Sequence, residues 1–185
     1  MTSVREQWIG VDIGGTKVAA AVVTATGEVI QTVRAATPST GGQAVLGTVA
    51  ELIVGLLAHH EAGGIGVGAP GIVDRTTGRV TFASDILTGW AGADVRGVLE
   101  SRTGLPVTVD NDVRVMAHGE NTIGAGRGRG SVVFVSIGTG IGGALSVDGT
   151  LRHGAHGTCG ELTHLLVPAT GAIACGCGRA DHLEA

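Results

Sequence analysis

Short apolar runs separated by glycine-rich turns open the chain. Trp8–Val11 is an apolar run that ends on the acidic residue Asp12, and after a glycine pair a second, β-branched run covers Val18–Val23. Short apolar runs bounded by turn residues predict strands, so this stretch predicts a strand, a turn and a strand. A third strand is predicted over Glu28–Thr37, where β-forming residues follow a glycine turn.

The following segments alternate between helical and strand patterns. Gln43–His60 places its apolar residues three and four positions apart, which predicts a helix with one wide apolar face. Ile65–Ala69 predicts a buried strand, so the order of three strands, a helix and a strand indicates an α/β fold. Trp90 is expected in a loop, with its side chain exposed. The same criteria predict a strand, a helix, a strand and a helix at Arg79–Phe82, Asp94–Thr103, Val107–Val109 and Val113–Ile123.

The turn between the first two strands has the composition of a phosphate-binding loop. The adjacent glycines Gly14 and Gly15 let backbone N–H groups approach an anion closely, while Thr16 and Lys17 add a hydroxyl and a cation. Asp12, at the end of the preceding strand, is placed to reach a metal ion through water. The alternative is an ordinary hairpin turn that contains a lysine, because short motifs often match by chance.

A second stretch repeats this layout and favours the phosphate interpretation. Within Val135–Val147, Ser136 falls on Asp12, and Gly138-Thr139 falls on the glycine pair of the first turn. Two similar glycine hairpins far apart in the chain suggest a duplicated β-domain. The duplication therefore predicts that both hairpins together bind the phosphates of a nucleotide.

The strongest catalytic candidates follow the strand predicted at Val107–Val109. Asp110, Asn111 and Asp112 come at its carboxyl end, which in a parallel α/β sheet points into the crevice where ligands bind. Asp112 is a candidate for accepting a proton from a hydroxyl, and Asn111 for holding neighbouring hydroxyls. Alternatively, Asp110 or Asp112 caps the helix that follows, and both interpretations can hold together.

The last third of the chain carries a set of residues suited to zinc. A histidine, a Cys-x-Cys pair and a second histidine supply four nitrogen and sulfur donors, the number that structural zinc prefers. The alternative is two ordinary thiols in a glycine-rich loop. The four candidate ligands are His164, Cys175, Cys177 and His182.

Composition narrows the class of protein. The 185 residues include 43% hydrophobic side chains, enough for a core in one large or two small domains. A net charge of −4, no basic stripe and only 2% aromatic residues argue against nucleic-acid binding. No apolar run is long enough to span a bilayer, and the first residues lack the layout of a secretory signal, so a cytoplasmic protein is expected. Three cysteines fit a reducing compartment.

Taken together and in order, these motifs resemble those of the ROK sugar kinases. The resemblance implies an α/β fold of the actin-like ATPase (ribonuclease-H-like) type with a duplicated domain. Residues 1–112 would form the N-terminal α/β domain with the first phosphate hairpin. Residues 113–185 would form a partial C-terminal domain with the second hairpin and the zinc-type motif, because the chain stops short of the family's length. The motifs are Asp12-Ile13-Gly14-Gly15-Thr16-Lys17, Gly68-Ala69-Pro70-Gly71-Ile72-Val73-Asp74, Asn111-Asp112, Gly138-Thr139-Gly140-Ile141-Gly142-Gly143, Gly160-Glu161-x-x-His164 and Cys175-x-Cys177-Gly178.

The resemblance also implies an activity, the ATP-dependent phosphorylation of a hexose at its primary hydroxyl, with ATP and sugar in a cleft. Glucose, giving glucose 6-phosphate, is the favoured substrate, and Asp112 would be the general base. The sugar hydroxyls would be held by Asn111, Glu161, His164 and Glu184. The ATP phosphates and Mg²⁺ would be held by Asp12, Gly14, Gly15, Thr16, Lys17, Gly138, Thr139 and Gly140. A structural Zn²⁺ would be held by His164, Cys175, Cys177 and His182.

Several residues depart from the family pattern, and the length leaves other functions open. Thr163 replaces a glycine, His182 replaces the third zinc cysteine, and Arg114 replaces the second asparagine of Asn-Asp-Ala-Asn. The alternatives are a catalytically impaired sugar-binding fragment and a sugar-responsive regulator that lacks its DNA-binding module. Polyphosphate in place of ATP, and a homodimer, also remain open.

Overall fold

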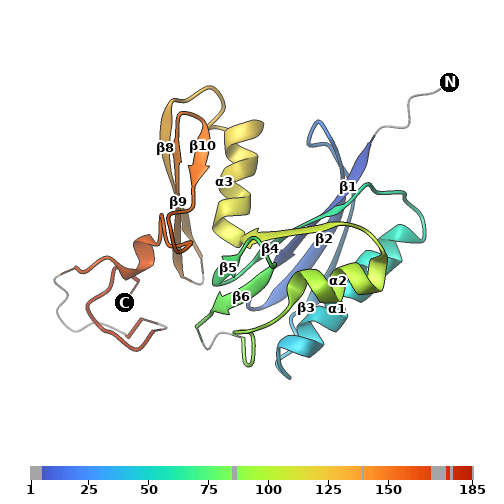
Figure 1. Cartoon of the computed structure of the whole chain (residues 1–185), viewed down its shortest axis with the longest axis horizontal. Coiled ribbons are helices and arrows are strands. Elements are labelled where there is room, and N and C mark those ends of the chain that lie inside the picture. The colour runs from blue at the N-terminus through green and yellow to red at the C-terminus, as the bar shows by residue number, and fades with distance from the viewer. Residues whose placement is uncertain (1–5, 85–86, 139, 168–173, 176, 185) are drawn as a thin grey trace. The chain divides into compact units, whose positions relative to one another are not determined.

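The chain divides into two compact units, which are described separately. The computed structural model describes residues 6–84, 87–138, 140–167, 174–175 and 177–184. The first unit comprises residues up to Ala83 and Leu87–Asp112, and the second comprises Ser84–Ile86 and Val113–Ala185. Figure 1 shows the helices and strands of both units with their labels.

A mixed five-stranded sheet forms the centre of the first unit. Its strand order is β3-β2-β1-β4-β7, with β2 antiparallel to both β1 and β3, and with β1, β4 and β7 parallel. The second strand alternates regularly between buried and partly exposed residues, as expected for a strand with one face on the core. The five strands are β1 (Gln7–Ile13), β2 (Lys17–Thr24), β3 (Val29–Ala36), β4 (Ile65–Ala69) and β7 (Val107–Asn111).

Two helices pack on this sheet. Helix α1 (Gly42–Leu57) buries an apolar face at helical spacing and packs against β2, β3 and the second helix. Helix α2 (Val95–Thr103) packs against β7, and its N-terminus is capped by the Asp94 side chain, which accepts from the Gly97 N–H over 3.0 Å. The strand-to-helix pattern predicted from the sequence is confirmed, with element ends that differ by at most a few residues.

A small hairpin completes the first unit and corrects one expectation. It consists of β5 (Ile72–Asp74) and β6 (Arg79–Phe82). Trp90, expected to be exposed, is wholly buried in the core, and its indole N–H donates to the Pro70 carbonyl over 3.0 Å. The expectation was wrong because a loop residue can fold its side chain inward when a backbone acceptor satisfies the indole N–H.

The second unit is a helix against a three-stranded antiparallel sheet. The sheet order is β10-β9-β8, and the helix packs on it through a small core of Ala117, Phe134 and Ala144 (Figure 1). The long loop after β10 carries one short 3₁₀ turn, η1. The elements are α3 (Asp112–Thr122), β8 (Ser131–Ile137), β9 (Ile141–Val147), β10 (Thr150–Arg152) and η1 (Leu162–His164).

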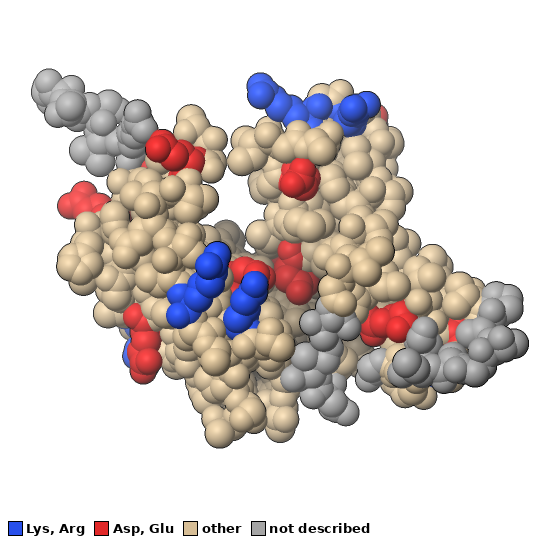
Figure 2. All heavy atoms as spheres, turned by 180° about the vertical axis from the view of Figure 1, so that it is seen from behind, with Lys and Arg blue, Asp and Glu red and all other residues tan. Residues whose placement is uncertain are grey.

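Charges are mixed on one face of the molecule. Figure 2 shows one face, on which the Lys and Arg side chains lie in small groups with uncharged surface and acidic side chains between them. Among the described residues, no helix is both long enough and apolar enough to cross a bilayer.

Candidate functional site

The first glycine turn, between β1 and β2, is closed by its own backbone. The Gly14 N–H donates to the Lys17 carbonyl over 3.0 Å. Thr37, just after β3, donates its hydroxyl to the Gly14 carbonyl over 2.6 Å and its N–H to the Thr16 carbonyl over 3.0 Å. Gly15, Thr16 and Lys17 are exposed. The Gly14 amide is therefore engaged within the turn, and the part of the turn offered to an anion is Gly15 to Lys17.

Asp12 and the Asp110-Asn111-Asp112 triplet at the end of β7 lie at the same edge of the sheet. Asp12 pairs in register with Gly68 on β4, and Gly68 pairs with Asp110 on β7. Because adjacent strands lie about 4.8 Å apart, the Asp12 and Asp110 backbones are separated by about 10 Å. This edge is the carboxyl end of three parallel strands, where α/β sheets bind ligands.

The three members of the triplet have different environments. Asp110 accepts from the Asn111 N–H over 2.8 Å and pairs with the Arg75 guanidinium over 3.1 Å, so it braces the strand end. Asn111 is buried, and its amide donates to the Gly71 carbonyl over 3.1 Å, which fixes its orientation. Asp112 is half-buried in the first turn of α3, where the helix dipole favours a negative charge.

The second glycine turn, between β8 and β9, is one residue shorter than the first. Ile13 pairs with Val18 across the first turn, whereas Ile137 pairs directly with Ile141 across the second. Gly138 donates its N–H to the Gly140 carbonyl over 2.9 Å, which accounts for the tighter turn. The two hairpins thus share their place between antiparallel strands but not their register. Thr139, predicted to bind phosphate, lies outside the described residues.

Two side chains from the loop after β10 form hydrogen bonds with the backbone of Ile141, the residue that follows this second turn. The Glu184 carboxylate accepts from the Ile141 N–H over 2.9 Å, and the Thr163 hydroxyl donates to the Ile141 carbonyl. Glu184 also donates its own N–H to the Thr163 carbonyl over 3.3 Å. Thr163, which departs from the family pattern, therefore has a structural contact that a glycine could not make.

The other residues predicted to bind sugar are on the same loop. Glu161 is half-buried and pairs with the guanidinium of Arg114 over 3.1 Å. His164 ends the short turn η1, two residues before an isolated bridge that joins Leu166 to His182. The structure therefore brings Glu161, His164 and Glu184 into one segment of the second unit, while Asn111 and Asp112 end β7 and begin α3.

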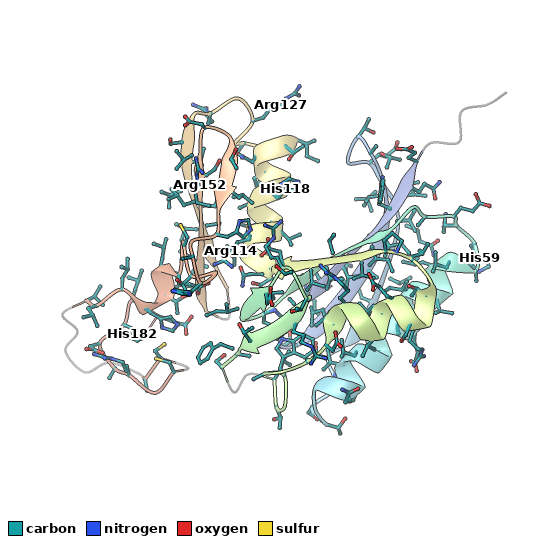
Figure 3. The ribbon with its side chains drawn as sticks, in the orientation of Figure 1. His59, Arg114, His118, Arg127, Arg152 and His182 are labelled. Atoms are coloured by element: carbon teal, nitrogen blue, oxygen red, sulfur yellow. The ribbon has the colours of Figure 1, made fainter. Side chains whose placement is uncertain are left out.

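The four predicted zinc ligands come together in the described structure. Their ligand atoms all lie within 4.8 Å of one another. The two Nδ1 atoms of His164 and His182 are 3.2 Å apart, Cys177 Sγ is 3.2 Å from His182 Nδ1, and Cys175 Sγ is 4.0 Å from His164 Nδ1. Figure 3 labels His182 in this loop.

This arrangement fits a tetrahedral zinc ion. Zinc–nitrogen and zinc–sulfur bonds of about 2.0–2.3 Å place tetrahedral ligand atoms about 3.3–3.8 Å apart, close to the separations of 3.2, 3.2 and 4.0 Å just given. The loop that holds the ligands is built around backbone bonds from Cys175 to Arg179 and from Gly178 to Cys175. Cys175 is buried, and burial raises the pKa of its thiol. A metal ion would reverse this by stabilising the thiolate.

An exposed ion pair braces the same loop. The Arg179 guanidinium donates through Nε and Nη2 to the two carboxylate oxygens of Asp181 over 2.8 and 2.6 Å. This two-pronged hydrogen bond lowers the pKa of Asp181 to about 2.

Sequence patterns did not identify three of these contacts. The carboxylate bond from Glu184 to Ile141, the Arg75–Asp110 pair and the convergence of the loop on Arg114 each join segments far apart in the chain. The one available signal was that Arg114 and Thr163 differ from the residues expected at their positions. The contacts that Arg114 and Thr163 make could be identified only from the structure.

The chain has the actin-like ATPase (ribonuclease-H-like) fold, which it shares with its solved relatives. Residues 8–185 match the ROK family. The chain belongs to that family, which confirms the resemblance found in the sequence.

Named relatives include kinases of known structure. The glucokinase of Streptomyces coelicolor is 39% identical over 170 residues, which make up 92% of this chain and 52% of the relative. A ROK family glucokinase from Streptomyces griseus, solved with glucose and AMPPNP, has a TM-score of 0.88 and 36% identity over 96% of this chain and 56% of its own. A ROK hexokinase from Thermus thermophilus has a TM-score of 0.78 and 34% identity over 96% of this chain and 59% of its own. The chain thus spans about half the length of the curated relatives it matches.

Proposed function

We propose that this chain serves the ATP-dependent transfer of a phosphoryl group to the primary hydroxyl of a hexose, with glucose as the favoured substrate. The observation that carries the proposal is the edge of the first sheet, where Asp112 follows the buried, oriented Asn111 and shares the carboxyl ends of parallel strands with Asp12. A relative that is 36% identical was solved with glucose and AMPPNP, which are the two ligand types this edge would serve.

In the proposed reaction, the hexose hydroxyl oxygen attacks the γ-phosphorus of ATP. The new oxygen–phosphorus bond forms as the bond to the bridging oxygen of the β-phosphate breaks, and ADP leaves. Asp112 takes the proton of the hydroxyl, and Asn111 holds a neighbouring hydroxyl. Phosphoryl transfer depends mainly on positioning and on charge stabilisation, so the other groups that we propose for it are the glycine turns, the carboxylates and Lys17.

Two metal ions belong to the proposal. Mg²⁺ would neutralise charge on the ATP phosphates, and Asp12 at the strand end is the residue proposed to position it. Zn²⁺ would hold the loop that carries His164 and Glu184, through the two histidines and two cysteines already described. The sugar-binding role of Glu161, His164 and Glu184 is proposed from their common loop.

A coupled assay of ADP release tests the proposal. The chain is incubated with ATP, Mg²⁺ and a panel of hexoses, and the product is assigned by its ³¹P resonance. We expect hexose-dependent ADP release with glucose 6-phosphate as the product. Hexose binding without any transfer would instead support the sugar-binding alternative, and the absence of both binding and transfer would refute the proposal.

A further inference from the structure

One arginine is enclosed by the protein. Among the described residues, Arg114 is the only Lys, Arg, Asp or Glu classed as buried, with 1% of its surface exposed. It lies in the first turn of α3, on the side that faces β8, β9 and β10 (Figure 3). Burying a guanidinium costs free energy, which acceptors for its donors offset. The identity of those acceptors therefore indicates what the residue does.

Three acceptors of Nη2 come from one short loop. Nη2 of Arg114 donates to the carbonyl oxygens of Gly157 over 2.6 Å and Cys159 over 3.1 Å, and to Oε1 of Glu161 over 3.1 Å. Every second residue of the loop thus turns an oxygen toward the same nitrogen. The loop therefore converges on Nη2 of Arg114, and Glu161 is the residue at which it ends.

The far side of this loop is fixed as well. Gly160 has a φ of +89° and lies so close to β9 that a side chain there would meet the backbone of Gly143 and Ala144. The Cys159 N–H also donates to the His153 carbonyl over 3.0 Å. The loop is therefore held between β9 and Arg114.

We infer that Arg114 is a positioning residue for hexose binding, which acts by holding the Glu161 carboxylate and its loop in the binding geometry. The inference rests on the proposed function, in which Glu161 binds a sugar hydroxyl. Its burial keeps Arg114 from touching the sugar, so it acts through Glu161. A lysine could not replace it fully, because its ammonium lies one bond nearer the backbone than Nη2 and does not reach the three acceptors in the same way.

The test combines a sugar readout with a loop readout that needs no sugar. Glucose affinity and kcat are measured for Arg114→Met, Arg114→Lys, Glu161→Gln and the double variant Arg114→Met/Glu161→Gln. The rate of Cys159 alkylation, resolved by mass spectrometry, reports the order of the loop. Arg127→Met, at an exposed arginine of the same unit, is the matched control.

Arg114→Met should weaken glucose binding by about tenfold or more, since contacting residues of this kind couple strongly, with a smaller effect on kcat. It should also accelerate Cys159 alkylation, Arg114→Lys should be intermediate in both, and Arg127→Met should match the wild type. In the Glu161→Gln background, the loss caused by Arg114→Met should shrink. If Arg114→Met does not fold, the same comparison is made with Arg114→Lys and the double variant Arg114→Lys/Glu161→Gln.

The possible failures are distinguishable. Unchanged glucose affinity in Arg114→Met or Arg114→Lys, with a wild type that binds glucose, overturns the inference alone. Equal losses in the wild-type and Glu161→Gln backgrounds also overturn it, because Arg114 would then not act through Glu161. A wild type that binds no hexose overturns the proposed function and, with it, the role of Arg114 in sugar binding. If Cys159 alkylation is then also equal in Arg114→Met and the wild type, Arg114 does not hold the loop either.

Discussion

Removing one ligand of the proposed zinc site should release the loop that carries it. The perturbation is His182→Ala, which removes the donor that lies 3.2 Å from both His164 Nδ1 and Cys177 Sγ. Among the described residues from 174 to 184, only Cys175 and His182 are buried, and both are proposed ligands. Among these described residues, little apolar burial is therefore available to order the loop without the metal.

The expected size of the effect follows from typical zinc affinities. Structural zinc binds with an apparent free energy of about 10–16 kcal/mol at neutral pH, so each of four ligands accounts for about 3 kcal/mol. Losing one ligand should lower the affinity by about a hundredfold, because about 1.4 kcal/mol corresponds to tenfold. His182→Cys retains a donor and should keep most of the affinity.

Zinc content and a competition titration with a chromophoric chelator measure this effect. The wild type should bind one zinc ion per chain, and limited proteolysis should cut the 165–184 segment faster in His182→Ala than in the wild type. His156→Ala, which removes an exposed histidine outside the cluster, is the matched control. An unchanged zinc affinity in His182→Ala, or a wild type that binds no zinc, would refute the reasoning.

Two further predictions concern stability and pH. Trp90→Phe removes a buried indole and its hydrogen bond, and should lower the free energy of unfolding by roughly 1–3 kcal/mol, measured by urea titration; an unchanged midpoint would contradict the burial of Trp90. The Asp181 pKa is lowered to about 2, so its contribution to stability is present above the ordinary value of 3.8 and is lost as pH falls through about 2. A carboxyl ¹³C titration should give that midpoint, and Arg179→Ala should return it toward 3.8; equal midpoints in the two proteins would contradict the ion pair.

The local pattern of the first unit was largely predictable because it depends on neighbouring residues. Hydrophobic periodicity located α1, and the helix predicted over Asp94–Thr103 is α2, which begins one residue later with Asp94 as its N-cap. Strand patterns located β1, β2 and β4 for the same reason. Trp90 was placed wrongly because the carbonyl that satisfies its indole N–H belongs to a residue 20 positions away.

The candidate site was predictable in its residues but not in its contacts. The two glycine hairpins, the Asp110–Asp112 triplet and the four zinc-type ligands were all identified from residue type and spacing. The one-residue difference between the two turns was not, because register depends on how two strands pair. The hydrogen bond from Arg114 to Glu161 joins positions 47 residues apart, so no local sequence pattern could predict it.

The most direct test of the central claim is the rate of phosphoryl transfer by Asp112→Asn beside its neighbour Asp110→Asn. A general base contributes about 10²–10⁴-fold to a rate, so Asp112→Asn should lower kcat by at least about a hundredfold while glucose affinity changes little. Asp110→Asn, which loses its pairing with Arg75, should alter stability more than kcat. Equal kcat values for Asp112→Asn and the wild type would contradict the account.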